Sequence, residues 1–352
     1  MTHPALQAQH QAAGAHFADA AEYNPVVHYG DVAGEYQAVL KHTALMDAGD
    51  AGRLWIHDRD RAALLQRLST NDVEKLAPGQ GQQTVLTNHN GRIIDLLTVH
   101  ALPEQLLVIT SPQQRNAVFQ LLRKNIFFND KVKLDQANAT LGQLLLYGPE
   151  SAAQIQTLTG AAVADLPLYG ILAAQLNGVD LWAARIRSLG GAGFALYLSA
   201  EELPAVWTAL VAAGAQPLGR AAYNQLRVEA GYPAYGRELS IEYIPLETGL
   251  HEAISFTKGC YIGQEIIARM ESRKRIAKHL RGLRLSGMID TPRKLEVDGK
   301  EAGDLTSVVE SPRFGPIGLA YVRRMHAQPG ASVGIAESEI TGEVVALPFS
   351  QS

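Results

Sequence analysis

Hydrophobic and polar residues alternate over residues 52–58, which is typical of a half-buried β-strand. Leu54 and Ile56 fall on one face of this strand, and Arg53 falls on the other. Asp58 is expected to cap the helix that follows, because an aspartate side chain accepts hydrogen bonds from the free N–H groups at a helix start. The pattern therefore predicts a strand that leads into a helix.

A polar turn is expected where that helix ends, at residues 69–72, because Ser, Thr, Asn and Asp hydrogen-bond their own backbone. Such a turn is a candidate lining of a site. Residues 82–86 and 92–100 then have the pattern of strands, and the intervening Asn-His-Asn-Gly at 88–91 is a strong hairpin signal. We therefore expect a β-hairpin, with a further strand at 105–110.

The most regular helical pattern follows Ser199 and ends at Gly214. Residues 199–202, Ser-Ala-Glu-Glu, have the form of a capping box, and a glycine is a common helix terminator. The apolar residues of this helix fall on one face, as expected for a helix that packs against a core. They are Leu203, Val206, Trp207, Leu210 and Val211.

The pattern changes at about Gly282 to short β segments with frequent Gly and Pro, which predicts a separate small β-barrel at the C-terminus. The expected segments are 283–285, 295–297, 317–322 and 342–347. Upstream, strands and helices interleave without repeated βαβ units, so the expected fold class is α+β.

Composition narrows the classes of function. The 31 Lys and Arg residues are outnumbered by 35 Asp and Glu residues, so no overall positive field attracts nucleic acid. Cys260 is the only cysteine, which excludes an intrachain disulfide, a zinc finger and an iron–sulfur cluster held by this chain alone. This usage fits the reducing cytoplasm. No apolar run approaches the roughly 20 residues that a membrane helix needs.

The chemistry is expected at residues 258–265, Lys-Gly-Cys-Tyr-Ile-Gly-Gln-Glu. Gly259 and Gly263 would let the backbone turn tightly on either side of the Cys-Tyr pair, and a helix is expected from Gln264. A thiol ahead of a helix start and near Lys258 is in a setting that favours reactivity. The alternative is that Cys260 is a small buried apolar residue, which is the commoner role of a single cysteine.

A second candidate lies in residues 226–236. If this segment is extended, Arg227 and Glu229 point to the same face, and the carboxylate can grip a ligand ring through paired hydrogen bonds. The alternative is a structural salt bridge at a sheet edge, which is the commoner outcome for such a pair.

A third candidate is a local run of basic residues between 269 and 284. It is a weak candidate for binding a polyanion, RNA or an acidic partner, because such runs are usually solvated surface. Its members are Arg269, Arg273, Lys274, Arg275, Lys278, Arg281 and Arg284. No metal site is expected, since none of the 11 histidines pair at the spacing that puts two ligands on one helix face.

Together these segments resemble a known family. The octet at 258–265 is similar to the K-G-C-Y-x-G-Q-E signature of the YgfZ family, folate-dependent proteins that support iron–sulfur cluster assembly and repair and are related to the glycine cleavage T-protein. T-protein landmarks are also matched over most of the chain. They are residues 29–31, 45–47, 52–54, 68–73, 91–99, 226–236 and 317–322.

The resemblance implies three domains around a central opening that binds a tetrahydrofolate or a one-carbon derivative. A discontinuous folate-binding domain is expected at 26–140 and 215–280, an α+β second domain at 141–214, and the barrel at 281–352. Residues 1–25 are expected to form a loose arm, because the start of the chain is rich in Ala and Gln and has no match to the family. Implied partners are iron–sulfur proteins or their assembly factors, with neither a membrane nor direct nucleic-acid contact, apart from the weak candidate at 269–284.

The resemblance also implies roles for single residues. Glu229 inherits the glutamate that grips the pterin, because a carboxylate accepts two adjacent ring donors at once, and Arg227 and Tyr232 belong to the same ligand segment. Asp95 matches the first Asp of the T-protein Asp-Asp pair, which lies near the reactive nitrogens of the folate. It is therefore a candidate for folate binding and, with Cys260 and Lys258, for catalysis. The remaining octet positions, Gly259, Tyr261, Gly263, Gln264 and Glu265, complete the signature.

Two departures from the T-protein pattern leave two hypotheses. Leu96 replaces the second Asp, and Cys260 stands where T-proteins usually carry Asp in a K-x-D-F-x-G segment. The first hypothesis is a folate-binding accessory protein for iron–sulfur enzymes such as radical-SAM tRNA-modifying enzymes, with Cys260 as the reactive group. The alternative is an aminomethyltransferase or related one-carbon transferase of the T-protein type, which the retained Asp95 favours.

Overall fold

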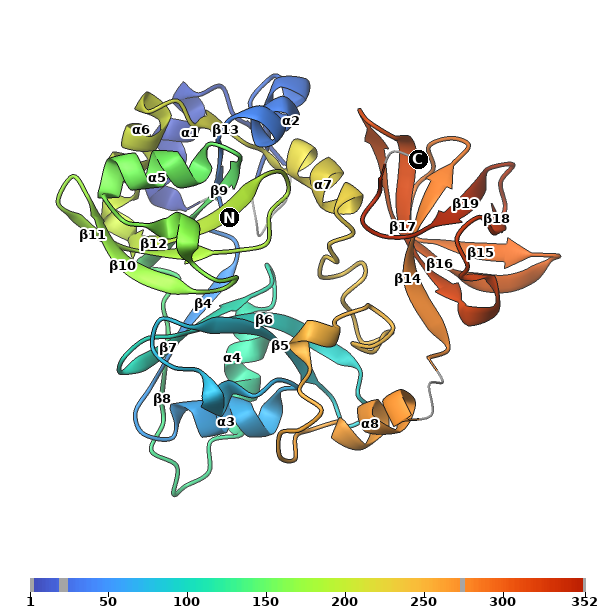
Figure 1. Cartoon of the computed structure of the whole chain (residues 1–352), viewed down its shortest axis with the longest axis horizontal. Coiled ribbons are helices and arrows are strands. Elements are labelled where there is room, and N and C mark those ends of the chain that lie inside the picture. The colour runs from blue at the N-terminus through green and yellow to red at the C-terminus, as the bar shows by residue number, and fades with distance from the viewer. Residues whose placement is uncertain (1–2, 19–24, 273–275, 351–352) are drawn as a thin grey trace. The chain divides into compact units, whose positions relative to one another are not determined.

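The computed structural model describes residues 3–18, 25–272 and 276–350, and these residues form two compact units. The first unit consists of the described residues of Met1–Gln66, Asp72–Thr84 and Leu97–Tyr223. The second consists of those of Arg67–Asn71, Val85–Leu96 and Asn224–Ser352. Mixed helices and sheets in both units confirm the α+β expectation (Figure 1).

A six-stranded sheet organises the first unit, in the order β10-β11-β12-β9-β3-β13. Its strands are β10 (Ile171–Leu176), β11 (Val179–Arg185), β12 (Ala192–Ser199), β9 (Leu141–Gly148), β3 (Ala44–Asp47) and β13 (Gln216–Pro217). Helices α2 (Val32–Lys41), α5 (Ser151–Thr159) and α6 (Leu203–Ala212) belong to the same unit. Gly190 and Gly191 lie in the turn that joins the antiparallel strands β11 and β12.

Strand β12 is buried on both faces, which explains its nearly continuous apolar sequence. Phe194 and Leu196 pack with Leu203 and Trp207 in one hydrophobic cluster. Tyr197, on the opposite face, packs in another cluster with residues of the second sheet. The apolar stripe of the helix after Ser199 therefore points into the core as predicted, although Val211 stays partly exposed.

The second sheet has five strands in the order β5-β6-β7-β4-β8. They are β5 (Gly81–Thr87), β6 (Ile93–Ala101), β7 (Gln105–Thr110), β4 (Gly52–His57) and β8 (Lys133–Gln136). Helices α3 (Arg61–Leu68) and α4 (Arg115–Lys124) follow β4 and β7 in the chain. The hairpin, the 105–110 strand and the strand-to-helix order are confirmed.

Helix starts differ from the sequence expectations. Asp58 has a left-handed φ of 74°, and its carbonyl, not its side chain, meets the N–H of Arg61. The predicted capping box is replaced by a 3-10 turn, Ala200–Glu202, and Ser199 makes no side-chain cap hydrogen bond. In both places a tight turn satisfies the backbone that the side-chain cap was expected to satisfy.

Arg53 was expected on a polar strand face but is fully buried. Its guanidinium donates to the carbonyls of Ala48 (3.1 Å), Ala51 (3.0 Å) and Gly49 (3.3 Å). Burial lowers the pKa of Arg53 to about 10, which still leaves the group charged at neutral pH. The arginine thus holds the turn between β3 and β4.

The N-terminal residues, expected as a loose arm, are folded where the structure describes them. They form η1 (Pro4–Leu6), α1 (Gln7–Ala12) and β1 (His16–Phe17), which pairs with β2 (Val26–His28). Leu6 is buried in the cluster that contains Trp207, and His10 Nε2 lies 3.1 Å from a carboxylate oxygen of Asp47. The Ala- and Gln-rich composition misled the prediction because two buried side chains suffice to fix a short helix.

A closed six-stranded barrel confirms the predicted C-terminal domain, in the order β14-β17-β16-β15-β18-β19 (Figure 1). Its strands are β14 (Lys278–Leu285), β15 (Arg293–Val297), β16 (Lys300–Ser311), β17 (Gly315–Arg323), β18 (Ser332–Ile335) and β19 (Thr341–Val345). Before the barrel the second unit contains the end of α7 (Arg220–Glu229), η5 (His251–Ala253) and α8 (Gln264–Ser272).

Strand β17 faces two cores. Ala320 and Val322 pack in the barrel interior, while Leu319 and Tyr321 pack against Tyr243 and other residues between α7 and the barrel. The barrel therefore supports the segment that follows α7, through Leu239, Tyr243, Leu250 and Ala253.

Candidate functional site

The octet at 258–265 is a turn followed by α8, as expected, and Lys258 anchors it. The Lys258 side chain is buried, and its Nζ donates to the carbonyls of Ser69 and Asn71, both at 2.7 Å. It also lies 5.2 Å from the ring centre of Tyr261. The ammonium group is thus used to tie the octet to the 69–72 turn.

The 69–72 turn supports this region through its side chains. Thr70 Oγ1 donates to the carbonyl of Ala253 (2.6 Å) and accepts from the N–H of Val85 (2.9 Å). The Asn71 side chain donates to the carbonyl of Glu252 (3.0 Å). The polar turn was predicted as a candidate lining, and its contacts make it the support on which the octet is fixed.

Cys260 is exposed, which rules out the alternative of a small buried apolar residue. Its neighbour Tyr261 is buried, and burial raises the pKa of the Tyr261 hydroxyl to about 12. Glu265 is also exposed and pairs with Arg269 one helical turn later (2.8 Å). The thiol is thus exposed to solvent between a buried lysine and a buried tyrosine.

The two octet glycines differ in their structural need. Gly263 has a left-handed φ of 84°, and a Cβ there would meet the carbonyl oxygen of Asn88 at 2.7 Å and Cα of Gly91 at 2.9 Å. Gly259 has no positive φ, and a Cβ added to it would meet nothing within 4 Å. The conformational freedom that the sequence assigned to both glycines is therefore used at Gly263 and not at Gly259.

We expect Gly263→Ala to lower the free energy of unfolding by about 1–3 kcal/mol, because it adds both backbone strain and a clash with the β5–β6 hairpin. Gly259→Ala is the matched control and should leave stability almost unchanged. Denaturant midpoints of the two variants and the wild type measure the difference. Equal midpoints for both variants would contradict this account of the turn.

Residues 226–236 do not form the extended segment that was expected. Arg227 and Glu229 lie in the last turn of α7, where residues two apart point in nearly opposite directions. Arg227 pairs with Glu238 and Glu229 pairs with Arg313. The predicted arrangement of guanidinium beside carboxylate on one face is therefore wrong, and each residue has a separate partner.

Glu229 is buried at the end of α7 and reaches the β16–β17 turn. Its Oε1 accepts from the Ser311 hydroxyl (2.5 Å), and its Oε2 accepts from Arg313 Nε (3.0 Å) and Nη2. The Arg313 side chain is 39% exposed whereas that of Glu229 is 1% exposed. The partly exposed guanidinium of Arg313 thus covers the Glu229 carboxylate. A ligand that displaced this guanidinium would find a carboxylate already positioned to accept two hydrogen bonds.

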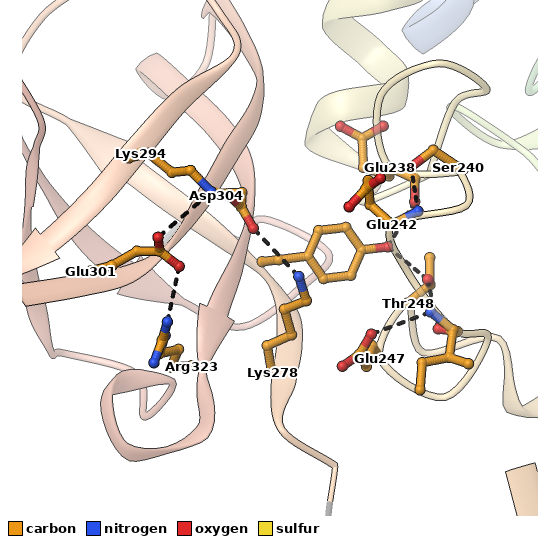
Figure 2. A network of polar contacts seen from close by, with 12 residues as sticks. Glu238, Ser240, Glu242, Glu247, Thr248, Lys278, Lys294, Glu301, Asp304 and Arg323 are labelled. Atoms are coloured by element: carbon orange, nitrogen blue, oxygen red, sulfur yellow. Dashed lines mark hydrogen bonds and ion pairs between the residues drawn. The ribbon is translucent and has the colours of Figure 1, made fainter. Parts of the chain in front are cut away.

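Arg227 is held by a buried network that the sequence did not reveal. Glu238 is fully buried, and its carboxylate accepts from Arg227, from the N–H of Ala234 and from the hydroxyls of Thr306 and Ser307 at 2.6–3.2 Å. Figure 2 shows Glu238 beside this part of the barrel. The network joins the end of α7 to β16.

Tyr232, another predicted ligand residue, follows α7 directly. Its N–H donates to the carbonyl of Arg227 (2.8 Å), and its own carbonyl accepts from Arg227 Nη1 (3.2 Å). These contacts fix the backbone turn after the helix.

Asp95 is fully buried in β6, and its carboxylate accepts from the N–H of Leu96 (2.9 Å). Its neighbours Ile93 and Leu96 pack in the same hydrophobic cluster as Val228, next to Glu229. Tyr261 packs in a different cluster with Ile267. In the second unit, the segments that contain Asp95 and Glu229 thus pack in one hydrophobic cluster. The turn that contains Cys260 packs through Tyr261 in a different cluster.

The described members of the basic run bind their own chain. Lys278 lies 3.4 Å from an Asp304 oxygen, Arg281 donates to the carbonyl of Ala327 (3.0 Å), and Arg284 donates to that of Ser350 (2.8 Å). Residues 273–275 lie outside the described residues. The run therefore does not present its described cations as one basic face.

Among the described residues, no group of three or more His, Cys, Asp or Glu side chains is arranged to hold a metal ion. In the same part of the chain, no helix has the length and apolar character needed to cross a membrane.

Family comparisons match nearly the whole chain. The model of the GCVT N-terminal domain matches residues 6–258, and that of the glycine cleavage T-protein C-terminal barrel domain matches residues 278–351. The crystal structure of the glycine cleavage system aminomethyltransferase T from Bartonella henselae has the same fold, with a TM-score of 0.89 and 22% identity over 98% of this chain and 97% of that one.

Curated relatives cover the same span. An aminomethyltransferase of Streptomyces avermitilis is 33% identical over 99% of this chain and 97% of the relative. One from Rubrobacter xylanophilus is 32% identical over 98% and 93%. A putative chloroplastic transferase of Arabidopsis thaliana is 33% identical over 87% of this chain and 71% of the relative. With two domain models matched in order and relatives aligned along almost the full length, the chain belongs to the glycine cleavage T-protein family.

Proposed function

We propose that the protein binds a tetrahydrofolate through Glu229 and serves iron–sulfur proteins as an accessory factor through the Cys260 thiol. Aminomethyltransferases of this family use tetrahydrofolate. The observation that carries the proposal is the exposure of the chain's only thiol on a turn fixed by Lys258 and Gly263, in an octet similar to the YgfZ signature.

Glu229 supplies the recognition of the pterin in this proposal. An ionised carboxylate accepts hydrogen bonds only, and a pterin edge offers adjacent N–H donors in the spacing of its two oxygens. The buried position of Glu229 strengthens such bonds because water does not compete for them. Arg313 supplies the counter-charge while no folate is bound.

Cys260 acts on a partner because one thiolate cannot hold an iron–sulfur cluster alone. The proposed clients are iron–sulfur proteins or their assembly factors, with radical-SAM tRNA-modifying enzymes among them. An exposed thiol on a rigid turn can take part in transfer, repair or shared ligation without rearrangement of this chain's core.

The second candidate is aminomethyl transfer to tetrahydrofolate, and the comparisons favour it. The bacterial relatives described above are named aminomethyltransferases, and Asp95 is retained and buried on β6. Leu96 and Cys260 are the two positions that depart from the T-protein pattern.

Complementation separates the two candidates. We expect the wild type to restore iron–sulfur enzyme activity and tRNA methylthiolation in a bacterial strain that lacks its YgfZ-type protein, and Cys260→Ala to lose most of that rescue. Cys260→Ser is the near-isosteric companion, and both variants should fold because the side chain is exposed. Equal rescue by wild type and Cys260→Ala would remove the thiol from the function.

The transferase candidate has its own assay. The purified protein, supplied with tetrahydrofolate and an aminomethyl-loaded lipoylated carrier protein, should give no transfer if the accessory role is correct. Transfer that Asp95→Asn abolishes, together with failure of well-expressed wild type to complement, would replace our proposal by the second candidate.

A further inference from the structure

Two adjacent phenylalanines are exposed on the loop that connects α4 to β8, the edge strand of the five-stranded sheet (Figure 1). Phe127 is 58% exposed, and Phe128 is fully exposed. Residues 125–131, called the aromatic loop below, belong to the first unit and have no role in the functions proposed above. Single exposed apolar side chains are common on protein surfaces, whereas two adjacent aromatic ones on one loop are typical of a binding surface.

Two reciprocal pairs of hydrogen bonds brace the aromatic loop. The N–H of Phe127 donates to a carboxylate oxygen of Asp130 (2.8 Å), and the N–H of Asp130 donates to the carbonyl of Phe127 (3.0 Å). The N–H of Lys131 donates to the Asp60 carboxylate (2.8 Å), and the N–H of Asp60 donates to the carbonyl of Lys131 (3.0 Å). The two rings are thus displayed on a turn that is already ordered, so binding through them costs little conformational entropy.

Cations flank the two rings along the chain. Arg123 and Lys124 end α4 just before the loop, Lys131 ends the loop, and all three side chains are exposed. Within the described part of the chain, none of these three forms an ion pair, and residues 123–133 contain four cations and one carboxylate. The loop is therefore locally positive in a chain whose formal net charge is -4, and it attracts an anionic surface.

The small apolar area of the loop decides between a protein and a lipid partner. Two phenylalanine side chains bury at most about 500 Å², whereas a stable protein interface takes about 800 Å² from each partner. Exposed polar neighbours, Lys124 and Asn129 among them, end the apolar area on either side of the pair. A lipid surface requires no complementary pocket, because aromatic rings enter the boundary between headgroups and acyl chains while cations stay among the headgroups.

We propose that the aromatic loop binds an anionic lipid surface. Phe127 and Phe128 enter the boundary between headgroups and acyl chains, and Arg123, Lys124 and Lys131 bind lipid phosphates. The contact is peripheral and reversible, because two rings and three cations give far less affinity than a helix that spans the bilayer. The family resemblance led us to expect no membrane contact, so this inference departs from that expectation, and it depends neither on folate binding nor on the thiol.

Co-sedimentation of the full chain with vesicles tests the loop. We expect the wild type to bind vesicles of about 30% phosphatidylglycerol in phosphatidylcholine and to bind pure phosphatidylcholine much more weakly. The double variant Phe127→Ser/Phe128→Ser should lower the partition coefficient at least about tenfold. Lys124→Gln and Lys131→Gln should each lower it about fivefold, and added salt should weaken the binding of the wild type.

Two variants outside the loop are the matched controls. Met288→Ser removes an apolar side chain that is 49% exposed between β14 and β15, and Lys300→Gln removes an exposed cation of β16. Both should bind the anionic vesicles as the wild type does. The substituted side chains are exposed in every variant, so thermal midpoints should stay at the wild-type value and show that lost binding is not lost folding.

Fluorescence distinguishes insertion of the rings from attraction by charge alone. Phe128→Trp should gain emission over the wild type on anionic vesicles, and lipids brominated on their acyl chains should quench the gain. Equal partition by the double phenylalanine variant and the wild type, or an unquenched Phe128→Trp, would show that the rings do not insert and would overturn the proposal. Folded wild type that stays in solution with anionic vesicles at low salt would also overturn it, and would leave a protein as the partner of this loop.

Discussion

Replacing Glu238 by glutamine is expected to lower the free energy of unfolding by about 3–5 kcal/mol, the range for breaking a buried ion pair on one side. The carboxylate is fully buried and receives four hydrogen bonds, one of them from the buried guanidinium of Arg227. Glutamine keeps the shape of the side chain but removes its charge. Its amide NH₂ would also face groups that donate to Glu238 in the wild type, so that donor would meet donor. Arg227 is then a buried cation without its counter-ion.

Denaturant unfolding of Glu238→Gln and of a surface control measures this effect. Glu301→Gln is the control, because Glu301 also pairs with two cations, Arg323 and Lys294, but in a solvated position where ion pairs contribute little. A midpoint shift confined to Glu238→Gln is the expected result. If both variants unfold at the wild-type midpoint, the network that joins α7 to β16 does not stabilise the second unit.

The sequence predicts the fold best where the burial of an element produces a regular pattern of apolar residues along the chain. β12 is covered on both faces and is apolar almost throughout. The helix that follows it buries only one stripe of side chains, which includes Leu203 and Leu210. The 88–91 turn is similarly local, because Gly91 adopts a left-handed φ of 67°. Patterns of this kind need only neighbours in the chain.

β16 was not predicted because several of its residues are polar and make contacts with distant parts of the chain. Its sequence contains Asp304, Thr306, Ser307 and Ser311, polar residues that interrupt the apolar pattern by which a strand is recognised. The structure gives each of them a partner: a lysine pair for Asp304, Glu238 for Thr306 and Ser307, and Glu229 for Ser311. Because these polar residues make tertiary contacts, β16 lacks the hydrophobic alternation from which a strand is predicted.

The sequence named candidate site residues but did not predict how these residues are arranged. Lys258 was placed beside Cys260 because they are two residues apart, yet its ammonium binds carbonyls of a turn 189 residues earlier. Arg227 and Glu229 were placed on one face because the segment was taken as extended, yet burial of Leu226 and Val228 holds it in a helix. Only the folded chain decides which partners such charged groups find.

Glu229→Gln is expected to weaken tetrahydrofolate binding by about 1.5–3 kcal/mol, or roughly tenfold to more than a hundredfold, because the variant loses a charge-assisted double acceptor. The Glu229 carboxylate is buried, so a pterin bound to it forms hydrogen bonds that water does not weaken. Glutamine offers one acceptor and one donor in the same space, so it opposes one of the two pterin N–H groups instead of accepting from it.

The measurement is the dissociation constant of tetrahydrofolate for Glu229→Gln, with Glu310→Gln as a control at an exposed carboxylate of the same β16–β17 region. Arg313→Gln extends the test, because removing the guanidinium that covers Glu229 changes folate affinity only if the ligand meets this carboxylate. Affinity that is unchanged in both Glu229→Gln and Arg313→Gln would move the pterin elsewhere. If only Glu229→Gln loses affinity, Arg313 does not need to move away when the ligand binds. Glu229 would then bind Arg313 and the ligand at the same time.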